Sequence, residues 1–287
     1  MNLREVGENR LLEKILPHLP RTRAVVNGAG DDCALVEFGR ANELLVLKTD
    51  AVVEGVHFRR DAKPGEVGWK AMARPLSDFA AVSARPQFAL ITILAPAKTT
   101  ERWITNLYRG LTRAAETFEV AIVGGETSAT RGPIAISVSL AGAVERDRFV
   151  SRSGGRAGDD LYVTGTLGGS IRGKHLRFVP RLEESRWLTS HFSIHAMMDL
   201  SDGLGADLPR LARASGVAFE IEEAALPLTR GCTAAQAISD GEDYELLFAI
   251  APNESKKLPA RWQKKFPKLR LTRIGRLVPR SASRAPS

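Results

Sequence analysis

The sequence contains only two cysteines, Cys33 and Cys232, and no CxxC pair of the kind that binds zinc. A disulfide framework is therefore excluded. Aromatic residues make up 6% of the chain, and its lysines and arginines are scattered although the formal net charge is +8. A nucleic-acid surface needs basic residues grouped with aromatic ones, so we predict no nucleic-acid partner.

Long apolar runs are also missing. No stretch approaches the roughly 18 residues that a membrane-spanning helix needs. The first nineteen residues are charged and lack the apolar core of a signal peptide. We therefore predict a cytoplasmic protein with no membrane partner.

Several catalytic signatures are absent from the sequence. There is no GxxxxGK[ST] phosphate loop, no GxGxxG followed by an acid, and no HRD or DFG of the protein kinases. No spacing indicates a Ser-His-Asp or Cys-His arrangement for nucleophilic catalysis. A phosphotransferase with this sequence would belong to none of those classes.

What is present is a globular composition, with 44% hydrophobic and 26% charged residues over 287 positions. This length fits one large or two medium domains. Apolar periodicity predicts helices over 5–19, 68–84 and 100–118, and strands over 44–49, 52–58, 88–94, 120–123, 134–144, 161–164, 219–221 and 242–250. Charge and glycine interrupt the pattern at 144–159, so we predict domains at 1–147 and 148–287. The mixture of elements indicates an α/β or α+β fold.

The placement of acidic residues is the most informative pattern. They stand at the ends or start of predicted strands, at a glycine turn, at a helix start and, for Asp78, within a predicted helix: Asp31, Asp32, Asp50, Asp78, Glu126, Asp199, Asp202, Glu242, Asp243 and Glu245. Carboxylates at such positions converge on one edge of a sheet in α/β proteins. Mg²⁺ takes oxygen ligands and accompanies phosphates, so a nucleotide–magnesium site is one interpretation.

A simpler interpretation stands beside it. Asp and Ser are common helix caps and turn residues, so each motif taken alone is explained equally well by local structure. Six separate acidic motifs in one chain without a shared role are less expected than six motifs that share one. Gly124-Gly125, after an apolar strand, would let backbone N–H groups approach a phosphate at a helix N-terminus, or would form a turn.

In chain order the sequence reads GAGDDCALV, LKTDAVVEGVHF, AMARPLSDFAAV, VGGET, SRSG, YVTGTLG, DLSDGLGADL and GEDYELLF. This series closely resembles the thiamine-monophosphate kinase family, from the superfamily that includes aminoimidazole ribonucleotide synthetase. The resemblance covers about residues 8–248. It implies a two-domain aminoimidazole ribonucleotide synthetase-like fold, an N-terminal sheet that forms a homodimer, and ATP bound with several Mg²⁺ ions. It also implies transfer of the γ-phosphoryl group of ATP to the phosphate of thiamine monophosphate.

Site residues follow from the resemblance, position by position. The implied magnesium ligands are Asp32, Thr49, Asp50, Asp78, Glu126, Asp199 and Asp202. The implied ATP contacts are Gly125, Glu126, Arg152, Ser201 and Tyr108. The implied contacts to thiamine monophosphate are His57 and Glu242.

The sequence departs from the family pattern at Lys48, Pro75 and Glu126, where the family has a small hydroxyl residue, Asn and Asp. Lys48 either replaces a cation or points away from the site. A helix expected after Gly173 and a C-terminal aromatic segment are missing. Besides a thiamine-monophosphate kinase, two alternatives remain: a related ATP-using enzyme with another acceptor, and a nucleotide-binding paralogue without turnover.

Overall fold

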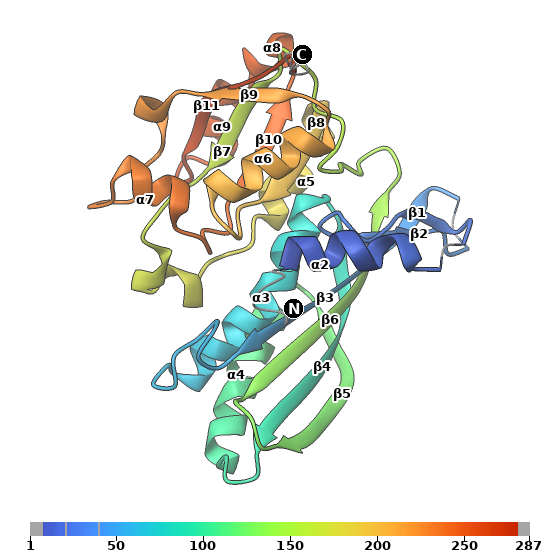
Figure 1. Cartoon of the computed structure of the whole chain (residues 1–287), viewed down its shortest axis with the longest axis vertical. Helices are drawn as coiled ribbons and strands as arrows, with labels where there is room; N and C mark the ends of the chain where they lie inside the picture. Colours follow the sequence, from blue (N-terminus) through green and yellow to red (C-terminus); the bar gives the residue numbers. More distant parts are fainter. Residues whose placement is uncertain (1–7, 21, 40, 281–287) are drawn as a thin grey trace, which may run out of the picture.

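The computed structural model describes residues 8–20, 22–39 and 41–280, which form two halves, each built on one sheet (Figure 1). The first sheet has the strand order β1-β2-β3-β6-β4-β5, with bounds Val25–Asn27, Ala34–Val36, Glu43–Val53, Ala135–Glu145, Arg85–Pro96 and Ala121–Thr130. The second has the order β8-β10-β7-β11-β9, with bounds Ile194–Asp199, Leu246–Ile250, Asp160–Thr164, Leu271–Val278 and Ala218–Ile221. The predicted mixed α/β class is confirmed.

Helices cover the sheets. In the first half they are α2 Glu8–Ile15, α3 Pro64–Ala81 and α4 Glu101–Thr117. In the second half they are α5 Leu182–His191, α6 Leu204–Ala214, α7 Ala234–Ser239, α8 Pro252–Ser255 and α9 Leu258–Lys265. Short 3-10 turns lie at Leu16–His18, Ser170–Arg172, Lys174–Leu176 and Glu223–Ala225. Among the described residues, none of these helices has the length and apolar character that a membrane crossing requires.

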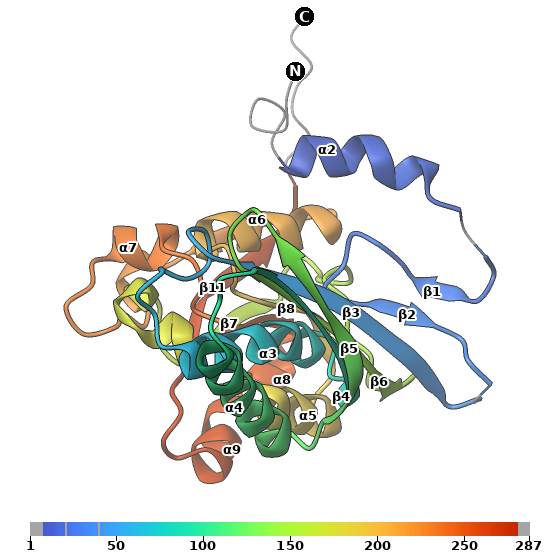
Figure 2. The same cartoon turned by 90° about the horizontal axis from the view of Figure 1, so that it is seen from below.

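Helix α3 is the central element of the molecule (Figure 2). Thirteen of its eighteen residues are buried. One face packs on β3 and β6 of the first sheet, and another contacts α5 and β8 of the second half. Helix α4 lies against α3, where Gly68 and Gly110 leave room for the facing backbone. A residue on α3 can therefore contact either half of the molecule.

The second sheet is the middle of three layers. Leu247 and Ala249 of β10 join a core with α6 and α7, whereas Leu246, Phe248 and Ile250 join a core with α5 and α9. This division follows from the alternation of side chains along a strand. Both faces of β10 are buried, which explains its continuous apolar sequence.

Two predicted strand boundaries are wrong. The strand expected at 44–49 lies within β3, which pairs with β6 without a break from Glu43 to Val53. Only residues 52 and 53 of the strand expected at 52–58 belong to β3, and residues 54–58 form a turn closed by a bridge between Glu54 and Phe58. The strand expected to end at 123 continues as β5 to Thr130. No helix begins at Gly124-Gly125, so the proposed phosphate site at a helix N-terminus is wrong for these glycines. Gly125 has a packing role instead, because a Cβ there would lie 1.8 Å from the Ile91 carbonyl oxygen.

Other differences are smaller. Helix α3 begins at Pro64, four residues before the predicted start, because proline suits a first helical turn that needs no N–H donor. The strand predicted at 242–250 begins only at Leu246. The domain boundary predicted after residue 147 falls in the connection between β6 and β7 and stays a prediction.

Candidate metal centre between the two sheets

Three buried carboxylates meet where the two halves join. Asp32 precedes β2, Asp78 lies on α3, and Asp199 is the last residue of β8. Each contributes one oxygen to a group in which all three oxygens lie within 4.8 Å of one another. Their exposed fractions are only 3%, 8% and 2%. The structure thus confirms that acids far apart in the sequence converge here.

Burial controls the charge of this acid cluster (Asp32, Asp78 and Asp199). Loss of solvent raises the pKa of all three carboxyls, and that of Asp199 rises to about 7. The neighbouring carboxylates raise the pKa of Asp78 and Asp199 further. Without a cation the ionised form of these carboxyls is therefore less favourable than it is for an exposed carboxyl.

Each of the three carboxylates has one identified partner. Arg152 Nη2 lies 2.5 Å from Asp32 Oδ1, Lys48 Nζ lies 2.9 Å from Asp78 Oδ1, and Ser77 Oγ donates to Asp199 Oδ2 at 2.6 Å. Asp32 Oδ2 is buried without a hydrogen-bond partner among the described residues. A buried carboxylate oxygen without a partner is costly. Oxygen ligands are those that Mg²⁺ prefers, so the residues present fit a divalent cation.

Asp50 lies beside the acid cluster on the helix-facing side of the first sheet. Asp50 of β3 is in register with Val138 of β6, which is in register with Ile91 of β4. Both neighbours are fully buried beneath the helices, so the side chain of Asp50 lies on that face. Arg74 of α3 approaches it, with 4.0 Å between Arg74 Nε and Asp50 Oδ2. The charge of Asp50 contributes to raising the pKa of Asp78. Asp50 therefore adds a further negative charge next to the acid cluster, on β3.

Glu126 and Thr49 are not brought to the acid cluster within one chain. Glu126 is in register with Thr92, and Thr49 with Ser139, in rows that alternate with the row of Asp50. Adjacent rows of a sheet point to opposite faces. Both side chains therefore lie on the face of the first sheet that α3 and α4 leave uncovered, which we call the open face.

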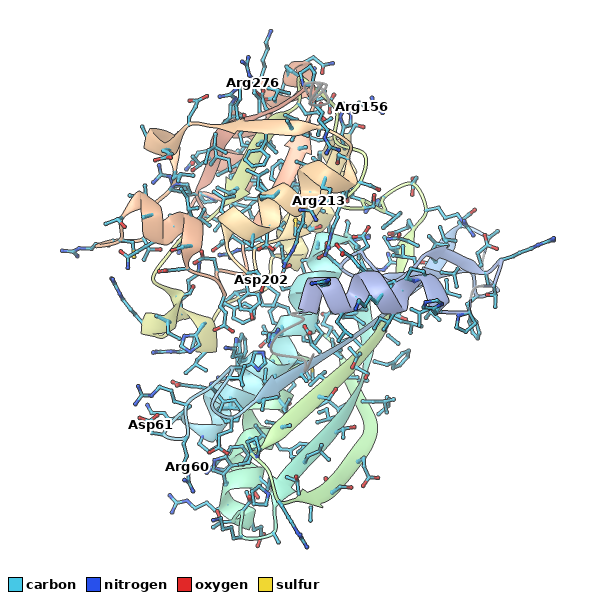
Figure 3. All side chains as sticks on the ribbon, in the orientation of Figure 1. Arg60, Asp61, Arg156, Asp202, Arg213 and Arg276 are labelled. Atoms are coloured by element: carbon cyan, nitrogen blue, oxygen red, sulfur yellow. The ribbon has the colours of Figure 1, made fainter. Side chains whose placement is uncertain are left out.

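The remaining predicted contacts are spread around the acid cluster. Asp202 is 57% exposed and forms an ion pair with Arg210, at the side of the second half that faces the first (Figure 3). The main-chain oxygen of Ser201 accepts a hydrogen bond from the Glu242 N–H at 2.7 Å. Tyr108 is half-buried and packs against the core of the first half. None of these three belongs to the three-carboxylate group itself.

His57 and Glu242 are linked by Lys70, a residue that the sequence analysis did not identify. Lys70 Nζ is fully buried and lies 2.5 Å from both the His57 carbonyl oxygen and Glu242 Oε1. The backbone N–H of Val53 donates to His57 Nδ1 at 3.0 Å, so the neutral ring carries its proton on Nε2. Burial, followed by Arg74 and Lys70, lowers the pKa of His57. The imidazole is therefore a neutral donor at pH 7.

A sequence signal for the missed cations exists. Lys70, Arg74 and Asp78 are spaced by four residues and therefore share one face of α3. Charged residues at this spacing inside an otherwise buried helix are unusual, because burying a charge requires a partner. That face of α3 connects the acid cluster to His57 and Glu242.

The acids of the 240–245 segment do not share one role, contrary to our expectation. Asp243 accepts from the Gly168 N–H and from Ser170 Oγ, and Glu245 forms a two-bond ion pair with Arg181 at 2.7 and 2.8 Å. Both are structural and hold the segment that follows β7. Glu242 and Tyr244 adopt positive φ angles of 62° and 52°, uncommon for residues other than glycine. This constrained backbone directs Glu242 towards Lys70.

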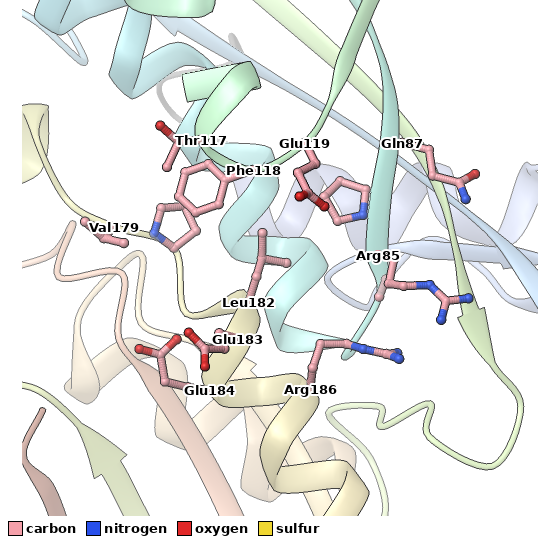
Figure 4. A pocket seen from close by; sticks show the side chains of 13 residues that line it. Arg85, Gln87, Thr117, Phe118, Glu119, Val179, Leu182, Glu183, Glu184 and Arg186 are labelled. Atoms are coloured by element: carbon pink, nitrogen blue, oxygen red, sulfur yellow. The ribbon is translucent and has the colours of Figure 1, made fainter. Parts of the chain in front are cut away.

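A cavity of about 690 Å³ lies elsewhere, between the start of β4, the end of α4 and the start of α5 (Figure 4). Arg85 and Arg186 line it, and both form ion pairs with Glu145. These pairs, Arg186 first, lower the pKa of Glu145 to about 2. All described residues that line this cavity lie outside the acid cluster, so we assign the chemistry to the acid cluster.

The sequence matches the N-terminal domain of AIR synthase related proteins over residues 30–144 and their C-terminal domain over residues 153–285. It is 37% identical to the thiamine-monophosphate kinase of Rhodopirellula baltica, over 90% of this chain and 85% of that protein. It is 36% identical to the thiamine-monophosphate kinase of Aquifex aeolicus, over 96% and 93%.

Structural comparison agrees. A solved structure described as AaThiL complexed with AMPPCP and TMP superposes with a TM-score of 0.84 and 34% identity. The match covers 98% of this chain and 93% of that one. The chain therefore belongs to the AIR synthase related proteins and, among them, to the thiamine-monophosphate kinase family.

Proposed function

We propose that this protein transfers the γ-phosphoryl group of ATP to thiamine monophosphate, giving thiamine diphosphate, and that it requires Mg²⁺. The observation that carries the proposal is the acid cluster, with its unpartnered Asp32 oxygen, in a chain related to thiamine-monophosphate kinases. A similar structure holds AMPPCP, an ATP analogue, together with TMP. Both substrates therefore have a precedent in this fold at 34% identity.

We assign separate groups of residues to the metal, the nucleotide and the acceptor. Asp32, Asp78 and Asp199 would hold Mg²⁺, with Asp50 beside them. Bound Mg²⁺ neutralises the charge of the phosphates during transfer. The acceptor is itself an ionised phosphate, so no general base is needed and positioning carries the rate. We assign Arg152 to the nucleotide phosphates because its guanidinium already contacts Asp32.

Residues on and beside α3 support a binding site for the acceptor phosphate. His57 presents a neutral N–H, and the buried Nε of Arg74 has no hydrogen-bond partner among the described residues. Both groups suit a phosphate oxygen. We therefore propose that the acceptor phosphate lies between Arg74 and His57, with Glu242 held in place by Lys70.

The direct test is formation of thiamine diphosphate from ATP and thiamine monophosphate with and without Mg²⁺, measured by chromatography. We expect product only with the metal. In H57A, loss of one hydrogen bond to a charged phosphate, worth about 1.5–3 kcal/mol, should raise KM for thiamine monophosphate about 10- to 100-fold. KM for ATP should stay within about twofold. Folded protein that binds ATP with Mg²⁺ but forms no product would favour another acceptor.

We also propose a homodimer formed by the open face of the first sheet. Leu47, Phe88, Leu90 and Leu94 lie on that face and are 39–51% exposed. Several large apolar side chains exposed on one face of a sheet are typical of an interface. Thr49 and Glu126 lie on the same face, so we propose that they complete the nucleotide–metal site in the dimer. From the likeness to thiamine-monophosphate kinases we further propose Gly125, Ser201 and Tyr108 as ATP contacts and Asp202 as a Mg²⁺ ligand.

The dimer proposal is tested with L90E. A charge at the centre of an apolar interface is costly to bury, so we expect this variant to be monomeric in analytical ultracentrifugation. I171E, at a residue that is 71% exposed on a 3-10 turn outside the sheet, is the matched control and should remain dimeric. A wild-type monomer, or a dimeric L90E, would contradict the proposal.

A further inference from the structure

Lys48 is directed at the acid cluster. It lies on β3 in register with Leu140 and Ala89, both buried beneath the helices, so its side chain is on the side of α3. Its Nζ lies 2.9 Å from Asp78 Oδ1, and the side chain is 22% exposed. Of the two possibilities for this residue, pointing away and replacing a cation, the structure excludes the first.

The ion pair occupies an oxygen that a metal would otherwise use. Asp32 and Asp199 likewise each have one oxygen engaged, by Arg152 and Ser77. One oxygen from each carboxylate is then left for a single cation. The geometry at Asp78 therefore favours one metal ion and one ammonium group in place of two metal ions.

The charge balance points the same way. Asp31, Asp32, Asp50, Asp78 and Asp199 bring five negative charges when ionised, because Arg152 also pairs with Asp31 at 3.7 Å. Three cations face them: Lys48, Arg74 and Arg152. Two negative charges are then left, which one divalent ion neutralises before a nucleotide arrives. A positive charge held within 3 Å of a ligand carboxylate also repels any divalent ion at that carboxylate.

We propose that Lys48 is a built-in cation that replaces one divalent metal ion of this site. The nucleotide-free protein then binds one divalent ion, at Asp32, Asp78 and Asp199, and the Lys48 ammonium takes the place of a second ion at Asp78. The proposal rests on the metal site of the proposed function but does not depend on the identity of the acceptor.

The test uses Mn²⁺ alone, without ATP or thiamine phosphates, and counts bound ions by electron paramagnetic resonance. Wild-type protein should bind one Mn²⁺ per chain. K48S removes the charge and leaves room for a hydrated ion, so it should bind two. K98S, at an exposed lysine of the β4–α4 connection, is the matched control and should bind one. Equal numbers in wild type and K48S would overturn the proposal.

K48M keeps the space filled and removes only the charge. We expect it to bind one Mn²⁺ with an affinity at least tenfold higher than wild type, because one competing cation is gone. This measurement decides the matter even if K48S does not fold. An unchanged affinity in K48M would show that Lys48 does not compete with the metal. Because no substrate is used, these outcomes are independent of whether thiamine monophosphate is phosphorylated.

Discussion

Replacing Asp199 with asparagine should make the metal-free protein more stable and the enzyme almost inactive. The burial of Asp199 raises its pKa from 3.8 to about 7, so its ionised form is disfavoured in the folded state. Asparagine has nearly the same shape and can still accept the hydrogen bond from Ser77 Oγ. It carries no charge, and we expect a gain of about 2 kcal/mol in the free energy of unfolding at pH 7.5.

The raised pKa of Asp199 also predicts how the stability difference between wild type and D199N changes with pH. Because the folded pKa of Asp199 lies above the unfolded one, the folded state binds the extra proton between about pH 4 and pH 7. Metal-free wild type should therefore lose stability relative to D199N as the pH rises through this window, and no more above it. Denaturant unfolding with EDTA at several pH values measures the difference.

With Mg²⁺ present, wild type should become more stable than D199N. Wild type gains stability from Mg²⁺, whereas D199N lacks a charged ligand and should gain little. Phosphoryl transfer should fall by about a thousandfold or more, since it depends on the metal. D147N, at an exposed aspartate near the end of β6, is the matched control and should behave as wild type throughout. An unchanged metal-free stability in D199N would refute the electrostatic account of the acid cluster.

Replacing Arg152 with methionine should have the opposite effect on stability. Arg152 precedes β7 and contacts Asp32 Oδ1 at 2.5 Å, while its Nη1 donates to the Gly30 carbonyl at 3.3 Å. It thus joins the segment before β2 to the second half. R152M leaves a buried carboxylate without its counter-charge, and breaking such a pair costs about 3–5 kcal/mol. We expect the free energy of unfolding of R152M at pH 7.5 to fall by an amount at the lower end of this range.

The loss should depend on pH and on metal. Burial raises the pKa of Asp32 even in the presence of Arg152, so without the arginine this carboxyl protonates more easily. Stability of R152M relative to wild type should therefore recover at pH 5, and Mg²⁺ should restore part of it at pH 7.5. R213M, at an exposed arginine of α6, is the control (Figure 3). Equal stability of R152M and R213M at every pH would show that the pair contributes nothing.

Much of this arrangement was predictable from local sequence. Helix α4 was predicted within one residue at each end, because its apolar spacing is strong and Thr100 caps it through the Trp103 N–H. The acids Asp32, Asp78 and Asp199 were selected by their positions beside glycine, on a helix and at a predicted helix start, although Asp199 in fact ends β8 and α6 begins at Leu204. The family was identified from the order of its motifs, and the comparisons confirm it.

The direction of side chains on β3 was not predictable. Every second residue of β3 lies on the same face. Lys48 and Asp50 share the helix-facing side with Leu44 and Val46, whereas Leu45 and Leu47 lie on the opposite face. Both faces are apolar, so the sequence does not show which one meets the helices. Packing of α3 decides it, and with it the direction of Lys48.

Local sequence patterns predicted the family and most helices and strands of the first half, and the ten selected acids included the three that meet. The folded contacts alone show that Lys48 pairs with Asp78, that Lys70 joins His57 to Glu242, and that Glu126 faces away from the acid cluster within one chain. Short-range patterns specify helices and strands because those depend on neighbouring residues. These contacts join residues up to 172 positions apart, as for Lys70 and Glu242, and arise only when two sheets pack against one helix.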